Sequence, residues 1–305
     1  KQTLSLEEIL NKLSDSKRSK RKSAARSLSK VLGKNIGIFS RITNTLIKEK
    51  NIEDTWRKFP NAQFSRHLAN DIEPEVVDAL RNAVVDTYTQ TSHRYYKLKA
   101  KWLGLKKLEI WDRNAPLPKD EEKLVSWTEA REIVTSAYTQ FDPRMKGLIQ
   151  PFFEEGWIDA VVKPGKSPGA FSHPTVTDVH PYILLNYQGK QRDVMTLAHE
   201  LGHGVHQSLA SSQGEILSST PLTLAETASV FGEMLTFQKI LAESTTELSR
   251  KQLLCGKVED MINTVIRQIS FYDFECRLHN DRQRGEITPD QIGKIWLDIG
   301  RESLG

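Results

Sequence analysis

The spacing of apolar residues between Glu73 and Leu103 constrains the fold more than any other feature of this chain. Apolar side chains recur at helical intervals through this segment, which is typical of an amphipathic helix. Glu73 and Pro74 form a typical helix start. We therefore predict one long helix over residues 73–103. Similar periodicity, with few strand patterns, continues through much of the chain, and the predicted fold class is mainly α.

A loss of periodicity near residue 118 indicates a domain boundary. Residues 110–119 contain two prolines, which interrupt helices. Ser126 and Glu129 then resemble a capping box that opens a helix. We predict a partial N-terminal helical lobe over residues 1–118 and a catalytic domain over residues 119–305.

The segment from Gly165 to Gly189 is rich in Gly, Pro, Ser and Thr and surrounds the strand-forming run Tyr182–Tyr187. This composition predicts a small sheet beside a cleft. Helical patterning resumes after Arg192 and continues to the end, apart from a loop near residues 211–220 and a break at 285–289. Because the chain opens on Lys1 and stops after an apolar helical run, we expect an internal fragment whose catalytic domain is incomplete at its C-terminus.

The composition is that of a soluble protein, with 38% hydrophobic and 27% charged residues. No stretch approaches the roughly 18–20 apolar residues of a membrane-spanning helix, and the first thirty residues lack an apolar signal core. We expect a cytoplasmic protein with no membrane partner. Its two cysteines, Cys255 and Cys276, are expected to be buried, reduced thiols.

A basic run near the start is compatible with two interpretations. It comprises Lys17, Arg18, Lys20, Arg21, Lys22 and Arg26. The first interpretation is a surface that binds nucleic acid. Apolar residues at helical spacing in the same segment favour the other, the solvated face of a helix. We therefore expect no nucleic-acid partner.

The segment from Asp193 to His206 contains candidate metal-binding and catalytic residues. On a helix, Val194, Leu197, Leu201, Val205 and Leu209 form one apolar stripe. His199 and His203 share a different face, one turn apart, so both imidazoles can bind one metal ion. Zinc in catalytic sites has three protein ligands and a water. Glu200 lies about 100° round the helix from His199, where it can reach that water as the general base.

The third ligand is not fixed by this segment. The extended histidine pattern needs glycine at 206 and histidine at 209, whereas the chain has His206 and Leu209. A carboxylate from a second helix is the alternative. Glu226 and Glu233 lie seven residues apart on one face of an apolar helical segment, and Glu226 comes first.

These residues resemble a known family. His-Glu-Leu-Gly-His-Gly-Val-His at 199–206 and Leu-Ala-Glu-Thr-Ala-Ser-Val-Phe-Gly-Glu-Met at 224–234 are similar to the oligoendopeptidase F branch of the thimet oligopeptidase (M3) zinc peptidases. The resemblance extends through Pro164–Phe171, His180–Tyr187, Trp111-Asp112 and Phe271–His279, and covers most of the chain from about Phe64 onward.

The resemblance implies a two-lobed, helical, gluzincin-like zinc-peptidase fold with a small β-sheet beside the active-site cleft. It implies a zinc-dependent endopeptidase for short unstructured peptides. By matching position, His199, His203 and Glu226 would bind one Zn²⁺ per chain, and Glu200 would activate the zinc-bound water as nucleophile. Gly169, Ala170 and Phe171 match a strand that presents its backbone to the substrate. The family's glycine-rich, oxyanion-stabilising segment has no match before Gly305, so activity of this fragment alone is in question.

Other residues have weaker assignments. His206 is expected to pack or to support the site rather than to bind metal. Glu233 and Asp193 are candidates for orienting the histidines, with capping or solvated roles as the alternative. His173, His180 and His279 are expected to be structural. The aromatic residues Phe271, Tyr272 and Phe274 are expected to pack in the core.

Two rival functions remain open. One is a basic interaction module with structural zinc or none, which would be indifferent to Glu200→Gln. The other is a zinc peptidase of a different carboxylate-ligand family, which cleavage against peptide length would distinguish.

Overall fold

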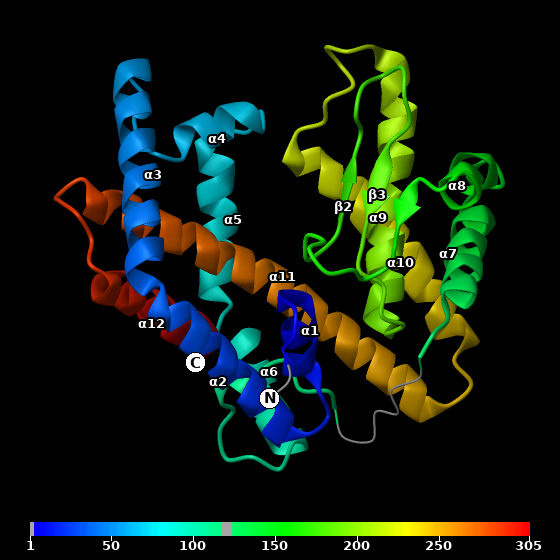
Figure 1. The fold of residues 1–305 in the computed structure, drawn as a ribbon, viewed down its shortest axis with the longest axis horizontal. Helices are drawn as coiled ribbons and strands as arrows, with labels where there is room; N and C mark the ends of the chain where they lie inside the picture. Colours follow the sequence, from blue (N-terminus) through cyan, green and yellow to red (C-terminus); the bar gives the residue numbers. More distant parts are fainter. Residues whose placement is uncertain (1–2, 118–123) are drawn as a thin grey trace. The chain divides into compact units, whose positions relative to one another are not determined.

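The computed structural model describes residues 3–117 and 124–305, which form helices and one small sheet (Figure 1). The chain divides into two compact units, unit 1 (residues 1–7 and 121–253) and unit 2 (residues 8–120 and 254–305). The mainly α prediction is confirmed. The predicted boundary between residues 118 and 119 lies outside the described residues. Residues 254–305 differ from the predicted division, because they group with unit 2 rather than with the rest of the catalytic domain.

Unit 1 holds the predicted metal-binding helix and the sheet. Its elements are α7 (Trp127–Phe141), α8 (Met145–Glu154), β1 (Ile158–Asp159), β2 (Phe171–His173), β3 (Tyr182–Leu184), α9 (Gln191–Ala210), η3 (Ser211–Gln213) and α10 (Leu222–Glu243). Helices α9 and α10 lie side by side (Figure 1). As predicted, Ser126 caps α7, with its hydroxyl accepting a hydrogen bond from the Glu129 N–H at 3.1 Å.

The sheet of unit 1 has the strand order β1-β3-β2. Strand β3 pairs in parallel with β1, with Ile158 opposite Ile183. It pairs antiparallel with β2, with Ser172 opposite Ile183. The predicted strand over residues 182–187 is shorter than expected, and β2 lies at an edge of the sheet.

The apolar stripe of α9 anchors the core of unit 1. Val194, Leu197 and Leu201 have no exposed surface, and Val205 is also buried. They pack with side chains of α7, α8 and β3. Leu209, predicted to belong to the same stripe, is instead 51% exposed, in the last turn of the helix. The buried stripe fixes the rotation of α9, so its histidine face points away from this core.

Unit 2 is helical throughout its described residues apart from loops. Helix α1 (Leu6–Asn11) spans the division between the units, and α11 (Glu247–Arg282) begins in unit 1 and continues in unit 2. The other elements of unit 2 are η1 (Lys12–Ser14), α2 (Arg18–Lys34), α3 (Ile36–Arg57), α4 (Phe64–Ala69), α5 (Pro74–Asp86), α6 (Ser92–Trp102), η2 (Ile110–Asp112) and α12 (Pro289–Leu304).

The segment predicted as one helix over residues 73–103 forms two helices, so this prediction was wrong. Pro74 begins α5 as expected, but α5 ends at Asp86 and α6 starts at Ser92. Between them the Thr87 hydroxyl donates to the Val84 carbonyl at 2.9 Å, and the Thr91 hydroxyl donates to the Thr87 carbonyl at 2.8 Å. Threonine hydroxyls offer the backbone such alternatives to helical bonding. The threonine-rich stretch therefore ends the first helix, although apolar periodicity continues through it.

The basic run of α2 is not simply a solvated face. Arg18 and Arg21 both donate to the Asp112 carboxylate, at 2.7 and 3.1 Å, and the side chains of Arg21 and Asp112 are buried. Lys20 pairs with Asp15, and Lys22 lies over the Trp111 ring. The interpretation as a wholly solvated face was therefore wrong at Arg21, because its charge is neutralised by an acid 91 residues away.

The described residues bear on three smaller predictions. Cys255 and Cys276 are free thiols as predicted, although they are partly rather than fully buried. Phe271 and Phe274 pack on Trp296, which confirms a packing role for both. None of the described helices is both long enough and apolar enough to cross a membrane.

Candidate metal centre

Helix α9 presents His199 and His203 on one face, one turn apart. Their ring centroids are 5.0 Å apart and the rings are nearly perpendicular. The His199 side chain is 27% exposed and that of His203 is 14% exposed. Both rings are therefore held by surrounding structure while remaining accessible to a ligand.

Helix α10 brings Glu226 to these two rings. One carboxylate oxygen, Oε2, lies 3.3 Å from His199 Nε2, and the other, Oε1, lies 3.7 Å from His203 Nε2. Tetrahedral ligand atoms about 2.0–2.1 Å from a zinc ion are about 3.4 Å from one another. His199, His203 and Glu226 thus fit a zinc ion in donor type, the two histidine–carboxylate distances fit it in spacing, and all three ligand atoms lie within 4.8 Å of one another. Within residues 3–117 and 124–305, they are the group of acids, histidines and cysteines close enough to share one metal ion.

Two further side chains of α10 orient these groups. Glu233 Oε2 lies 3.4 Å from His199 Nδ1, the ring nitrogen that faces away from Glu226. The buried Ser229 hydroxyl donates to Glu226 Oε2 at 3.0 Å. Groups that hold metal ligands in this way fix ring tautomer and carboxylate direction. The role of Glu233 is among the predictions from the sequence, whereas that of Ser229 is not, although its position one turn after Glu226 could have indicated it.

Glu200 is buried beside the cluster, with 6% of its surface exposed. Burial raises the pKa of Glu200 to about 7, and the charge of Glu226 also raises it, whereas His199 lowers it. Glu200 does not belong to the group of metal-spaced ligand atoms. Its carboxyl group therefore lies next to the centre without occupying a ligand position.

The two histidines have opposite pKa shifts. Burial lowers the pKa of His199, but the hydrogen bond with Glu233 and the charges of Glu200, Glu226 and Glu233 outweigh burial and raise it. For His203, burial is the largest cause and the pKa is lowered, even though the charge of Glu226 acts to raise it. The acid-rich side of the centre is therefore the side of His199.

The residues predicted to bind substrate lie at the start of the edge strand. Gly169 has φ of +85° and accepts a hydrogen bond from the Asn186 side chain, and Phe171 begins β2 opposite Leu184. Ala170, between them, packs against the core. The next residue of β2, Ser172, donates to the Gln207 side chain of α9 at 2.8 Å.

Gln207 also connects this strand to the metal face of α9. It lies one helical turn after His203, and its amide donates to the Ser172 carbonyl at 3.3 Å. This pair therefore holds the edge strand close to the candidate centre. This pair could not be predicted from the sequence, since no local pattern relates residues 35 positions apart.

Residues 12–305 match Peptidase family M3. The chain belongs to this family. Oligopeptidase PepF of Bacillus subtilis (strain 168) is 28% identical over 299 residues, covering 97% of this chain and 44% of that protein. An oligoendopeptidase F homolog of Lactococcus lactis subsp. lactis (strain IL1403) is 28% identical over 266 residues, covering 87% of this chain and 44% of that protein.

Solved structures share the fold of this M3 chain. PZ peptidase A with inhibitor 2 superposes with a TM-score of 0.85 at 18% identity, covering 99% of this chain and 54% of that structure. Oligoendopeptidase F from Enterococcus faecium superposes with a TM-score of 0.68 at 20% identity, covering 100% of this chain and 47% of that structure. The M3 chain thus spans less than half the length of the two curated relatives and about half of these structures.

Several other candidates in the M3 chain have structural roles. Asp193 accepts hydrogen bonds from the Gln188 and Lys190 N–H groups and caps α9. Its suggested role in orienting the histidines was therefore wrong, and the capping alternative holds. His180 stacks on Trp157 with centroids 3.8 Å apart, as a structural residue would. His206 is not part of the ligand group, as predicted, although its charge lowers the pKa of His203.

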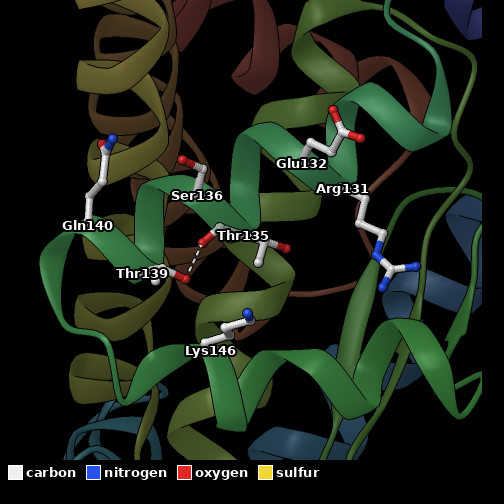
Figure 2. A pocket seen from close by; sticks show the side chains of 7 residues that line it. All are labelled: Arg131, Glu132, Thr135, Ser136, Thr139, Gln140 and Lys146. Carbon is white, nitrogen blue, oxygen red and sulfur yellow. Dashed lines mark hydrogen bonds between the residues drawn. The ribbon is translucent and has the colours of Figure 1, made fainter.

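A separate groove of about 490 Å³ lies against α7 and α8. Six side chains of α7, from Arg131 to Gln140, line it together with Lys146 of α8 (Figure 2). The Thr139 hydroxyl in this groove donates to the Thr135 carbonyl at 2.7 Å. None of the candidate site residues lines this groove, so it is distinct from the metal centre.

Proposed function

We propose that this chain is the metal-binding part of a zinc-dependent endopeptidase that hydrolyses internal bonds of short, unstructured peptides. The observation that carries the proposal is the approach of His199, His203 and Glu226 to one another beside the buried Glu200, in a chain of Peptidase family M3. The three ligands would hold one zinc ion per chain.

Each residue of the site would have one role. Bound zinc supplies a Lewis acid that polarises a carbonyl and lowers the pKa of water. Glu200 would take the proton of the attacking water and deliver it to the leaving amine. Glu233 and Ser229 would hold His199 and Glu226 in the orientation that the centre needs.

The substrate would bind by its backbone at the edge strand. Gly169 and Ala170 precede β2 and Phe171 begins it, and β2 pairs with β3 on one side only among the described strands. An extended peptide can add to such an edge through main-chain hydrogen bonds. The names oligopeptidase and oligoendopeptidase given to the relatives support a peptide substrate.

The test measures bound zinc per chain and hydrolysis of a short, internally quenched peptide. Wild type is compared with Glu200→Gln, which keeps the shape of the side chain and removes its basicity. Glu132→Gln, an exposed acid of the separate groove, is the matched control. We expect one zinc ion in all three proteins and turnover lowered about 10²–10⁴-fold in Glu200→Gln alone, the usual contribution of a general base.

Three other outcomes would change the proposal. Equal turnover in wild type and Glu200→Gln would refute the role of the base. Absence of zinc in the wild type would refute the metal centre and favour an interaction module. Zinc binding without turnover in wild type would show that this chain holds the centre but does not hydrolyse peptides by itself.

A further inference from the structure

The geometry of the candidate centre depends on the separation of two helices. His199 and His203 come from α9, and Glu226 and Glu233 come from α10. Any change in the distance or rotation between these helices would therefore move the carboxylates relative to the imidazoles.

The two helices are in close contact at two glycines. A Cβ atom added to Gly202 of α9 would lie 2.7 Å from the Ala228 carbonyl oxygen and 2.8 Å from Ser229 Cα. A Cβ atom added to Gly232 of α10 would lie 3.2 Å from the Ala198 carbonyl oxygen. These contacts involve backbone atoms, which cannot rotate away as a flexible side chain would. Gly202 is therefore needed for the observed spacing, and a side chain at Gly232 would press on the Ala198 carbonyl.

Tyr138 of α7 occupies the space that Gly232 leaves open. A Cβ atom at Gly232 would lie only 1.7 Å from the Tyr138 hydroxyl oxygen. That hydroxyl donates to the Ala198 carbonyl at 2.7 Å, and the side chain is buried, with 3% of the residue exposed. One phenol thus touches both helices at the point where they meet.

This contact is next to the metal-binding groups in the sequence. Ala198 immediately precedes His199, and Gly232 immediately precedes Glu233, whose carboxylate faces His199 Nδ1 at 3.4 Å. The hydroxyl of Tyr138 therefore bonds to Ala198 and packs on Gly232. The residues that follow these two in the chain, His199 and Glu233, form the facing pair.

We propose that Tyr138 is a positioning residue for the metal centre, and that its hydroxyl, seated on Gly232 and bonded to the Ala198 carbonyl, sets the spacing of α9 and α10. This inference rests on the proposed function. In the absence of the hydroxyl, α9 can rotate or shift relative to α10, and His199 loses its alignment with Glu226 and Glu233. The hydroxyl of Tyr138 bonds to the Ala198 carbonyl rather than to a candidate metal ligand, so its effect is transmitted through the two helices.

The simpler alternative is that the hydroxyl only satisfies a buried carbonyl. Tyr187 provides the matched control, because its hydroxyl also donates to a backbone carbonyl of unit 1, that of Val125, at 2.8 Å. Removal of either hydroxyl costs a tyrosine–carbonyl hydrogen bond, and the hydroxyl of Tyr187 also has a second, longer contact of 3.5 Å with the Ser126 carbonyl. Only the bond of Tyr138 lies between the ligand helices.

The experiment compares zinc affinity in four variants of the full chain. Tyr138→Phe and Gly232→Ala perturb the contact, and Tyr187→Phe and Gly147→Ala are their controls, since a Cβ atom at Gly147 of α8 meets nothing within 4 Å. Zinc affinity is measured by competition with a chelator. The visible spectrum of the cobalt-substituted chain reports ligand geometry, and thermal unfolding of the metal-free chain reports stability.

We expect zinc affinity to fall about tenfold in Tyr138→Phe and about a hundredfold in Gly232→Ala, the range found when groups that support metal ligands are changed. The cobalt spectrum should change in both variants and in neither control. If Gly232→Ala does not fold, Tyr138→Phe decides the question.

An unchanged zinc affinity and cobalt spectrum in Tyr138→Phe would overturn the inference, as would an equal loss in Tyr187→Phe. Failure of the proposed function is distinguishable, because it would appear as a wild-type chain that binds no zinc or as wild-type turnover that is indifferent to Glu200→Gln.

Discussion

Replacing Glu233 tests whether its carboxylate orients the candidate ligand His199 through the Nδ1 atom of the ring. Its carboxylate Oε2 lies 3.4 Å from His199 Nδ1, and its side chain is 18% exposed. Changes to groups that orient metal-binding histidines usually lower metal affinity about 10–100-fold, which corresponds to about 1.4–2.7 kcal/mol. The 3.4 Å distance is longer than the usual hydrogen bond of about 2.7–3.2 Å. We therefore expect Glu233→Gln, which retains an acceptor oxygen, to lose about tenfold, and Glu233→Ala to lose more, toward a hundredfold.

The assay is a zinc competition titration against a fluorescent chelator at fixed pH. Glu243→Ala is the matched control, because Glu243 lies on the same helix, has a side chain that is 59% exposed and pairs with Lys239. We expect its zinc affinity to equal that of the wild type. Zinc binding by Glu233→Ala as tight as in wild type would refute the reasoning, since the carboxylate would then contribute nothing to holding His199.

Two further predictions concern stability. Asp112→Ala would leave Arg21 buried without its acid, and the usual cost of such a loss is about 3–5 kcal/mol, measured by denaturant unfolding. Burial by itself raises the pKa of Asp112, but hydrogen bonds from Arg18 and other donors outweigh it and hold the pKa below 3.8. The stabilisation by Asp112 is therefore present above pH 3.8 and is lost as the pH falls through the lowered pKa. The free energies of unfolding of wild type and Asp112→Ala should therefore converge in acid. Gly204→Ala would place a Cβ atom 2.7 Å from the buried Phe152 ring, and a loss of about 1–3 kcal/mol is expected. An unchanged unfolding midpoint would refute that packing argument.

The local parts of the site could be predicted from the sequence because helix geometry relates neighbours in the chain. His199 and His203 share a face of α9 since they are four residues apart, and the stripe of Val194 and Leu201 is buried on another face. The capping role of Ser126 followed in the same way. Errors arose where a local interaction competed with periodicity, as Thr87 and Thr91 do between α5 and α6.

Contacts between distant segments could not be predicted from local patterns. The burial of Arg21 depends on Asp112, which is 91 residues away. The link of the edge strand to α9 depends on Ser172 and Gln207, which are 35 residues apart. No spacing rule relates such pairs, because their distance is set by how the elements pack.

The sequence by itself determined the pair of histidines, the acid Glu200 next to them in the chain and two acids able to complete the group. Only the tertiary structure placed Glu226 at the Nε2 atoms of both histidines and Glu233 at the opposite nitrogen of His199. The physical reason is that spacing along one helix is fixed by its hydrogen-bonded turn. The distance between two helices is fixed by the side chains at their contact, which here are reduced to single hydrogens at Gly202 and Gly232.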